Sequence, residues 1–532
     1  MHTRESEPVP EDAPARPEPA TDDDGLGSNV GRRSAWPTWI AVGATISLLT
    51  LLAMRGLLRN TNADGLLYSL ISTDHLTFYY WGQGRLASLV PAMASPVRDE
   101  WLNLRVQMFI LGCSFFGLIA AFVWAHRRTY PPSTSALVGF LAALTLAAAT
   151  AALALLPRTA YTFVFEQQYA FSMVLYLVSI HLVTQARSAA ARLVGSLTTL
   201  AAVLVIPATA LFLPFAWPLS NGAPSRVRRC VEMTGVTALS LLASVLAGSR
   251  FYGGPSESEL YNNFSPRRAL DGVPLAIEGI ADSVRIIPTV LALTVACVVL
   301  WVRRRRLSPL LVSVVAGAVV FALGWLVLFS GNRWVELNGF GYRYYFPVYA
   351  AGILVVAAAI SELIDALLQR LPTTARAGDI ATPPEVSAGG RAAVTVLAGA
   401  GALAVTWMAA FPTAVDWLPV LRNAEPATVA AERFDAEFVV GDYWQVWPTV
   451  FLGRSTGNDL LGIAYRSDPL VHDVRNAVAS ALDEGRDVRI VCLGEILDVC
   501  LDRFTSFTGR EWQVSDTIVR SPLIVELDPL EP

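Results

Sequence analysis

The sequence has little charge and no lysine at all. Of its 532 residues only 16% are charged, whereas about a quarter of the residues of soluble domains are charged. All 40 basic residues are arginines, which we attribute to codon bias rather than to function. The net charge of -4 gives no reason to expect a nucleic-acid partner. With 54% hydrophobic residues, this shortage of charge argues against an ordinary soluble protein.

Motifs that would indicate several common chemistries are also missing. The five cysteines have no metal-ligand spacing, and there is no nucleophile elbow and no phosphate-binding loop. Cys113, Cys230 and Cys297 lie in or beside apolar runs, where cysteine usually acts as a small core residue. Cys492 and Cys500 lie in a more polar region, where a disulfide or two buried thiols would fit equally well.

What the sequence does contain is a series of apolar runs near the length of about 20 residues that spans a bilayer. We therefore predict an all-α polytopic membrane protein with about 11 transmembrane helices. Prolines break one run, which we interpret as two short helices separated near Pro207. The predicted spans are residues 37–55, 104–125, 135–156, 169–185, the pair within 190–220, 231–248, 285–302, 308–330, 343–365 and 393–411.

Arginines near the ends of these runs predict the orientation of the chain. Arg32 and Arg33 precede the first span, and by the positive-inside rule they hold the N-terminus in the cytoplasm. The basic segments at 226–229 and 303–306 also favour the cytoplasmic side. An odd number of spans then delivers the C-terminal region to the outer face of the plasma membrane.

Three parts of the chain differ in composition. Residues 1–35 are rich in Pro, Glu and Asp and are predicted to be a disordered cytoplasmic tail. Residues 36–411 form the predicted transmembrane domain, with a first outer loop at 56–103. Residues 412–532 are predicted to form a small extracytoplasmic α/β domain, because strand-like runs alternate with a helical segment that ends at Gly485. The strand-like runs are "AEFVVGD", "LLGIAY", "DVRIVCLG" and "SPLIVELD".

The first outer loop, "NADGLLYSLISTDHLTFYYWGQGRLASLVP", holds unusually many reactive side chains. Asp64 follows the first span, and a carboxylate at the membrane face can take a proton from an acceptor hydroxyl as a general base. A helix cap or a solvated acid is the structural alternative for Asp64. Asp74 and His75 are secondary candidates. The aromatic run that includes Tyr80, followed by Gln83, also suits an interfacial helix lying on the bilayer.

A second polar region is the short outer loop before the fourth span. Glu166 sits between aromatic residues in "FVFEQQY" and is followed by Gln167. An acid at that depth is costly and often functional. The alternative is an acid at a helix N-terminus, where the helix dipole favours negative charge.

A third polar region is divided between two outer loops, 249–272 and 332–349. Glycines predict a mobile loop in the first, and arginines such as Arg250 suit an anionic group. Arg343, followed by Tyr344, opens a late span, where a charged residue needs a partner and a lipid phosphate would serve. Snorkelling of the arginine to lipid headgroups is the alternative.

In their order along the chain, these features resemble the GT-C superfamily of membrane glycosyltransferases. That superfamily includes polyprenyl-phosphate-sugar protein mannosyltransferase-like and lipid A aminoarabinose transferase-like enzymes. An Asp follows the first span in "NADGLLYSLI", and "FYYWGQGRLASLVP" is similar to an aromatic-Gly-Gln segment of many bacterial members. "RYYFP" is similar to the start of a late span, and "VVGDYWQVWPTVF" to the start of the C-terminal tail in some members.

The resemblance implies a GT-C-like fold and inverting transfer of a sugar from a polyprenyl-phosphate donor to an envelope glycan, lipid or protein. It implies that Asp64 is the base or a key acid and that Arg343 contacts the donor phosphate. It makes no cofactor certain and leaves a divalent metal open. Where the family often has a second acid, Asp64 is followed by Gly65. The candidate catalytic residues are Asp64, Glu166, Asp74 and His75, and the candidate substrate contacts are Arg343, Tyr344, Gln83, Tyr80, Arg250 and Gln167.

Two other classes of protein are the alternatives to a transferase. One is a transporter or flippase of envelope lipids, and the other is a non-catalytic GT-C-like membrane protein whose C-terminal region binds a partner. A transporter should carry ionisable residues near the middle of several spans. We expect the spans to be free of such residues apart from His181, with acids and arginines gathered at outer ends and loops. This distribution favours group transfer at the membrane surface.

Overall fold

The computed structural model is mostly helical. The described residues are 36–77, 88–127, 134–186, 188–221, 223, 225–251, 264–285, 308–368, 418–464 and 467–530. The predicted disordered tail, the predicted span at 393–411 and most of the span at 285–302 lie outside the described residues. Tyr80 and Gln83 lie outside them too.

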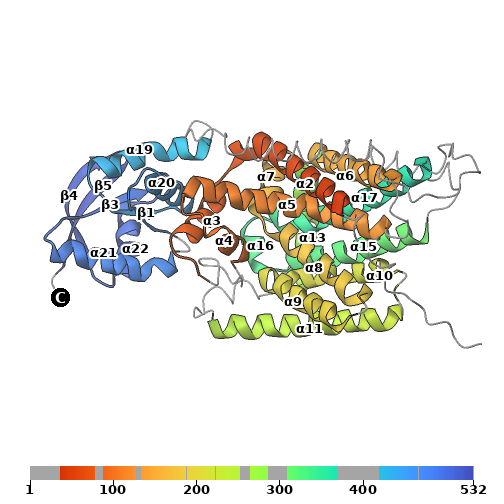
Figure 1. The fold of residues 1–532 in the computed structure, drawn as a ribbon. Helices are drawn as coiled ribbons and strands as arrows, with labels where there is room; N and C mark the ends of the chain where they lie inside the picture. The colour runs from red at the N-terminus through yellow and green to blue at the C-terminus, as the bar shows by residue number, and fades with distance from the viewer. Residues whose placement is uncertain are drawn as a thin grey trace, which may run out of the picture.

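Long apolar helices between residues 36 and 368 form one bundle, the membrane body (Figure 1). Its long helices are α2 (Trp36–Leu57), α5 (Glu100–Arg127), α6 (Thr134–Ala154), α8 (Tyr169–Gln185), α9 (Ala189–Val205), α11 (Arg226–Phe251), α15 (Pro309–Ser330) and α17 (Phe346–Leu368). Among the described residues, five helices are long and apolar enough to cross a membrane, or six when Pro157–Glu166 and Tyr169–Gln185 count as one bent span. The chain is a multi-pass membrane protein, while the figure of about 11 spans and their orientation stay predictions.

The predicted helix break near Pro207 is confirmed. Helix α9 ends at Val205, and a 3-10 segment, η3 (Pro207–Phe215), leads into the short α10 (Ala216–Leu219). Proline lacks the backbone N–H that would continue the helical hydrogen bonds, so the helix stops before it.

The segments between the long helices are themselves largely helical. They are η1 (Leu58–Asn60), α3 (Ala63–Thr73), α4 (Leu89–Ala94), α7 (Pro157–Tyr161), η2 (Thr162–Glu166), α13 (Pro266–Ser283), α16 (Arg333–Leu337) and η4 (Tyr342–Tyr345). The expectation of a mobile loop at 249–272 is wrong from Pro266 onward. Helix α13 begins there because proline suits the first helical position and the side chain of Ser265 accepts a hydrogen bond from the backbone N–H of Arg268.

Helix α3 turns the predicted first outer loop into part of the hydrophobic core. Leu66, Leu67, Leu70 and Ile71 are each at most 1% exposed. Burying a leucine or isoleucine side chain contributes about 2 kcal/mol. A helix held this firmly can position a polar side chain, and Asp64 lies in its first turn.

The expectation that His181 is the only ionisable residue within the spans is wrong. Glu362 and Asp365 lie within α17, and each is 6% exposed. The carboxylate of Glu362 meets the imidazole of His126 at the end of α5, with 3.3 Å between Oε1 and Nε2. Both acids belong to the last turns of α17, so the charge lies near the end of the helix rather than at its middle.

Residues 418–530, the C-terminal part, form the predicted α/β unit. Five strands pair in the order β2-β1-β3-β5-β4, with β1 parallel to β2 and β3 and with β5 antiparallel to β3 and β4. The strands are β1 (Phe438–Gly441), β2 (Leu461–Ile463), β3 (Val488–Leu493), β4 (Trp512–Arg520) and β5 (Leu523–Pro529). The helices are α19 (Pro419–Arg433), α20 (Tyr443–Ser455), α21 (Val471–Asp483) and α22 (Leu497–Thr508). All four predicted strands are present, and β4 is an additional one.

The alternative left open for the two C-terminal cysteines is settled as a disulfide. Cys492, in β3, is bonded to Cys500, in α22. The bond ties the third strand of the sheet to the helix that follows it. Among the described residues, Cys113 and Cys230 are free cysteines.

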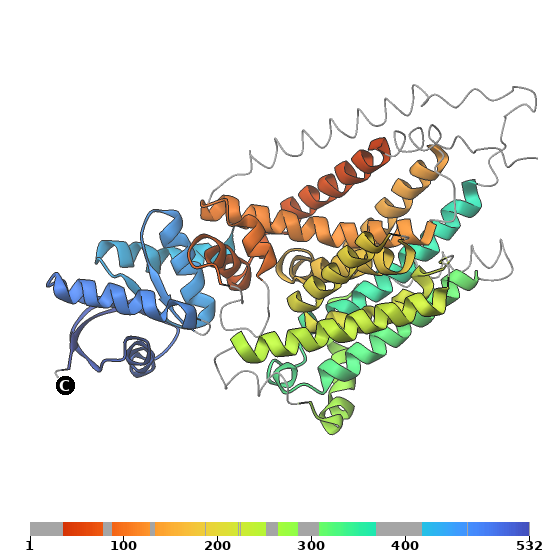
Figure 2. The same cartoon turned by 60° about the horizontal axis from the view of Figure 1, so that its bottom comes forward.

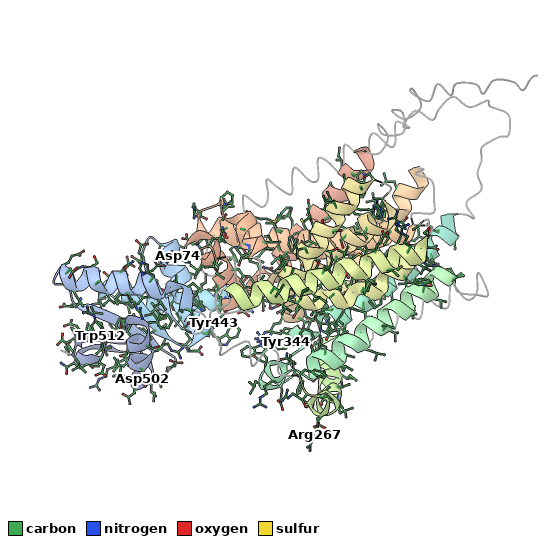
Figure 3. All side chains as sticks on the ribbon, turned by 90° about the horizontal axis from the view of Figure 1, so that it is seen from below. Asp74, Arg267, Tyr344, Tyr443, Asp502 and Trp512 are labelled. Atoms are coloured by element: carbon green, nitrogen blue, oxygen red, sulfur yellow. A yellow bond between two sulfur atoms is a disulfide. The ribbon has the colours of Figure 1, made fainter. Side chains whose placement is uncertain are left out.

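The C-terminal part lies at one end of the membrane body, with α20 against α3 (Figures 1 and 2). Arg454 of α20 forms an ion pair with Asp74, with 2.9 Å between Nη1 and Oδ1. The rings of Phe451 and Trp101 meet edge to face, with centroids 5.1 Å apart. Figure 3 shows Tyr443 at the edge of the C-terminal part that faces the helices. The C-terminal part is therefore docked on the membrane body through α20.

Candidate active site

Asp64 is held in the first turn of α3 by the sequence "NADG". The side chain of Asn62 caps this helix by accepting a hydrogen bond of 3.3 Å from the backbone N–H of Gly65. Asp64 itself is therefore not the cap, and at 5% exposure it is not a solvated acid either. A carboxylate buried to this extent must be paired or hydrogen-bonded. Both structural alternatives for Asp64 are thus excluded by its surroundings.

Two partners from distant parts of the chain reach the Asp64 carboxylate. The guanidinium of Arg343 lies 3.6 Å from it, measured from Nη1 to Oδ2. The hydroxyl of Tyr443 donates a hydrogen bond to the other oxygen, Oδ1. Hydrogen bonds and ion pairs to an ionised carboxylate are stronger than those between neutral groups. The arrangement fixes the orientation of the Asp64 carboxylate.

Glu166 lies close by and is almost completely enclosed, with 1% exposure. It ends η2, a π-helical segment, and such segments often occur at functional sites. Asn62 and Thr162 donate hydrogen bonds of 2.7 and 3.1 Å to Oε2, and Gln167 donates one of 3.0 Å to Oε1. Each oxygen of Glu166 thus has a neutral donor, which is what a buried carboxylate requires.

Asn62 connects the two acids. Its amide oxygen caps α3, while its amide nitrogen donates to Glu166. One side chain therefore fixes the start of the helix that carries Asp64 and the orientation of Glu166. Asn62 was not among the sequence candidates, although it stands only two residues before Asp64.

Arg343 is oriented by its neighbours at the start of a late span. Its Nη2 donates to the side-chain oxygen of Asn338 at 3.1 Å and to the hydroxyl of Tyr344 at 2.9 Å. The guanidinium carbon lies 5.0 Å from the centre of the Tyr344 ring. With 28% of its side chain exposed, Arg343 has a face left for a further anionic group. These contacts describe an anchored guanidinium rather than an arginine extended toward lipid headgroups.

Gly65 explains why no second acid follows Asp64 here. A Cβ at residue 65 would lie 2.7 Å from the hydroxyl oxygen of Tyr161, which is closer than real Cβ contacts allow. The space that a larger residue would need is occupied by the Tyr161 side chain, which is 1% exposed. In this chain the second carboxylate of the cluster comes from Glu166 instead.

Asp74 and His75 lie at the other end of α3. The ten residues from Asp64 to Asp74 correspond to about 15 Å along a helix. Asp74 pairs with Arg454, and Nδ1 of His75 lies 3.5 Å from Oδ2 of Asp473. Burial raises the pKa of Asp74, and Arg454 offsets only part of that rise. The structure therefore places these two candidates in the contact with the C-terminal part and not beside Asp64.

The remaining candidates divide between the site and its surroundings. Gln167 and Tyr344 belong to the cluster through their hydrogen bonds to Glu166 and Arg343. Arg250 has its backbone in α11, and its side chain lies outside what the structure describes. Tyr443 was missed as a site residue, although "GDYW" contributed to the sequence resemblance. Nothing in the local pattern says that its hydroxyl reaches residue 64.

The carboxylates of the site do not form a metal centre by themselves. Across the described residues, no group of three or more His, Cys, Asp or Glu side chains could hold a metal ion.

Comparisons with known proteins show likeness at the level of structure. No family model and no curated protein matches the chain. Its structure is similar to that of ArnT from Cupriavidus metallidurans in the apo state, with 15% identity over 93% of this chain and 98% of that chain and a TM-score of 0.46. It is also similar to an oligosaccharyltransferase from Archaeoglobus fulgidus in the apo form, with 12% identity over 86% of this chain and 70% of that chain and a TM-score of 0.35.

A third solved structure is of the archaeal oligosaccharyltransferase AglB from Archaeoglobus fulgidus, in complex with an inhibitory peptide and a dolichol-phosphate. It is 12% identical over 86% of this chain and 69% of that chain, with a TM-score of 0.33. The roles of individual residues rest on the geometry of Asp64, Glu166 and Arg343.

Proposed function

We propose that the protein is a membrane glycosyltransferase that moves a sugar from a polyprenyl-phosphate donor to an acceptor in the cell envelope. The observation that supports this most directly is the convergence of Asp64, Glu166 and Arg343 at one end of the membrane body. Two carboxylates beside one anchored guanidinium suit a reaction that removes a proton and releases an anionic phosphate.

The proposed reaction begins when the acceptor hydroxyl attacks the anomeric carbon of the donor sugar. A bond forms between that carbon and the acceptor oxygen while the bond from the carbon to the phosphate oxygen breaks. Asp64 takes the proton of the acceptor, and the polyprenyl phosphate leaves with the electron pair. Attack from the face opposite the leaving group inverts the configuration at the anomeric carbon.

Arg343 and Glu166 would support the two halves of this reaction. The exposed face of Arg343 can pair with the negative charge that develops on the leaving phosphate. Glu166, buried beside Asp64, favours proton uptake by Asp64, because two neighbouring carboxylates disfavour double ionisation. Glu166 is only 1% exposed and accepts hydrogen bonds from Asn62, Thr162 and Gln167, so we assign the base to Asp64, which lies where the resembling family keeps its acid.

We place the site at the outer face of the plasma membrane. Disulfides persist in oxidising compartments, and the Cys492–Cys500 bond lies in the C-terminal part that covers the site. The positive-inside rule gives the same orientation from the arginines at 32–33, 226–229 and 303–306. The expected acceptor is an envelope glycan, lipid or protein.

The proposal is tested by incubating membranes that contain the protein with a radiolabelled polyprenyl-phosphate sugar. Label should move from the lipid to a larger acceptor. Asp64→Asn should abolish this transfer at an unchanged amount of folded protein, while Asp271→Asn, on the exposed side of α13, should transfer at the wild-type rate. If the wild type transfers no label, the proposal that the protein is a glycosyltransferase is overturned. If Asp64→Asn transfers label at the full rate, only the assignment of Asp64 as the base is overturned.

A further inference from the structure

The C-terminal part inserts one side chain into the candidate active site. Tyr443 is the first residue of α20, and its side chain is largely buried, with 9% exposure. Its hydroxyl donates to Oδ1 of Asp64, a residue 379 positions earlier in the chain. Arg343 faces the other carboxylate oxygen, Oδ2. The two oxygens of the proposed base are therefore held by groups from two different parts of the molecule.

The local backbone fixes the direction of the Tyr443 side chain. Gly441 ends β1 at a φ of 138°, a conformation that favours glycine, and a Cβ there would collide with the carbonyl of Leu493. Asp442 then caps α20 by accepting a hydrogen bond of 3.0 Å from the backbone N–H of Trp444. Strand, turn and cap together present Tyr443 in one orientation.

Helices α3 and α20 lie side by side and contact each other near both of their ends. Asp64 meets Tyr443 where both helices begin, and Asp74 meets Arg454 where both helices end. Ten residues separate the two acids and eleven separate the two donors, which correspond to about 15 and 16.5 Å. Helix α20 thus lies along α3 with a donor for an acid at each end, and the ion pair at the far end keeps Tyr443 in register with Asp64.

We propose that Tyr443 is a positioning residue for the glycosyl transfer, which holds the Asp64 carboxylate in the orientation that receives the acceptor proton. This inference rests on the proposed function and deepens it, because it makes the docked C-terminal part a component of the active site rather than a separate binding module. The phenol cannot replace Asp64 as the base. Its contribution is to restrict rotation of the carboxylate and to stabilise its charged form.

Among the described residues, ionisable groups face Asp64 from several elements. They include Arg343 from η4, Glu166 from η2, Tyr161 from α7 and Tyr443 from α20. Either tyrosine can lose one oxygen atom without a change in the charge of the site at neutral pH, and the hydroxyl of Tyr443 is the one that donates to Asp64 in the described contacts. Tyr443→Phe is therefore the cleanest test.

With the label-transfer assay on the full-length protein, Tyr443→Phe should lower kcat by roughly tenfold to a hundredfold, the effect expected for losing one hydrogen bond to a charged group. The KM for the donor should change little. The acid limb of the pH–rate profile should move to higher pH, because the charged carboxylate loses a stabilising donor. Tyr176→Phe is the matched control, since it removes a similarly buried hydroxyl bond, 2.7 Å to Thr237, away from the site. It should leave kcat and the profile unchanged.

Arg454→Gln is the second variant, which loosens α20 from Asp74 and keeps the phenol. It should move the acid limb of the pH–rate profile to higher pH by a smaller amount than Tyr443→Phe does. If Tyr443→Phe does not accumulate as folded protein, the measurement on Arg454→Gln tests the proposal instead. An unchanged kcat and profile, or a higher kcat, in Tyr443→Phe would overturn the positioning role while the wild-type enzyme still transfers label. If the wild type transfers no label, the proposed function fails, and the positioning role fails with it.

Discussion

Two buried polar clusters lie near the two ends of helix α5, and their described partners come from different parts of the molecule. The site cluster consists of Asp64, Glu166 and Arg343. The far cluster consists of His126, Ser308 and Glu362. Helix α5 passes both, since its first residue, Glu100, accepts a hydrogen bond from Ser69 of α3 and its last turn carries His126. The 26 residues between them correspond to about 39 Å.

The far cluster has the features of a structural joint. Among its described contacts, the Glu362 carboxylate meets the imidazole of His126 and accepts a hydrogen bond from Ser308, whose side chain also caps α15. One acid thus joins the ends of three helices, α5, α15 and α17. The two partners described for it, His126 and Ser308, belong to the membrane body.

The site cluster has a different composition. Among its described contacts, two carboxylates lie near one arginine, and a donor to Asp64 comes from the C-terminal part. The comparison teaches that burial of an ionisable group does not by itself single out a candidate site. Contact from a second structural unit is the feature that distinguishes Asp64 from Glu362 among these described contacts.

The largest expected effect that separates the clusters comes from Glu166→Gln. Removing the second carboxylate weakens the drive for Asp64 to take a proton, so we expect transfer of label to fall by about a hundredfold. Glu278→Gln, on an exposed face of α13, is the matched control and should transfer normally. A Glu166→Gln enzyme with wild-type kcat would show that Glu166 serves only packing. The site cluster and the far cluster would then both have a structural role for their buried glutamate.

The sequence predicted the members of the site cluster better than it predicted their arrangement. Asp64, Glu166 and Arg343 stand out because each is an ionisable residue near the end of an apolar run, and burial at such a depth requires a partner. Asp74 and His75 looked similar because sequence spacing does not say which end of α3 faces the arginine. Tyr443 could not be predicted as a site residue, since its contact with Asp64 depends on how the C-terminal part docks.

In the fold as well, the features set by local sequence were predicted, whereas those set by long-range packing were not. The helix break at Pro207 and the C-terminal strands follow from local chemistry, namely a missing N–H and runs of β-branched residues. Strand β4, which has mostly exposed side chains, carries the weakest pattern and was missed. The helix α3 was taken for a loop with an interfacial segment, because its burial comes from long-range packing against α5 of the membrane body and α20 of the C-terminal part.

His126→Ala tests whether the far cluster contributes to stability alone. Removing the imidazole from Glu362 should lower the free energy of unfolding by about 2 kcal/mol, the scale of a hydrogen bond to a charged group. Thermal unfolding of the purified protein in detergent measures this, with the exposed His472→Ala as the matched control. Transfer per folded molecule should equal that of the wild type. A lower kcat at unchanged stability would instead connect the far cluster to the reaction.

Ser308→Ala should destabilise the protein by about 2 kcal/mol, an effect similar to that of His126→Ala, because it removes one helix cap and one hydroxyl donor of Glu362 while it leaves the pairing of His126 with Glu362. The Ser308 side chain accepts a hydrogen bond of 3.0 Å from the backbone N–H of Leu311, and losing such a cap costs about 1 kcal/mol. Ser313→Ala, in the same helix, is the control, since the Ser313 hydroxyl only donates to the carbonyl of Pro309. If Ser308→Ala left the free energy of unfolding unchanged, neither the cap nor the hydroxyl donor of Glu362 would contribute to the joint.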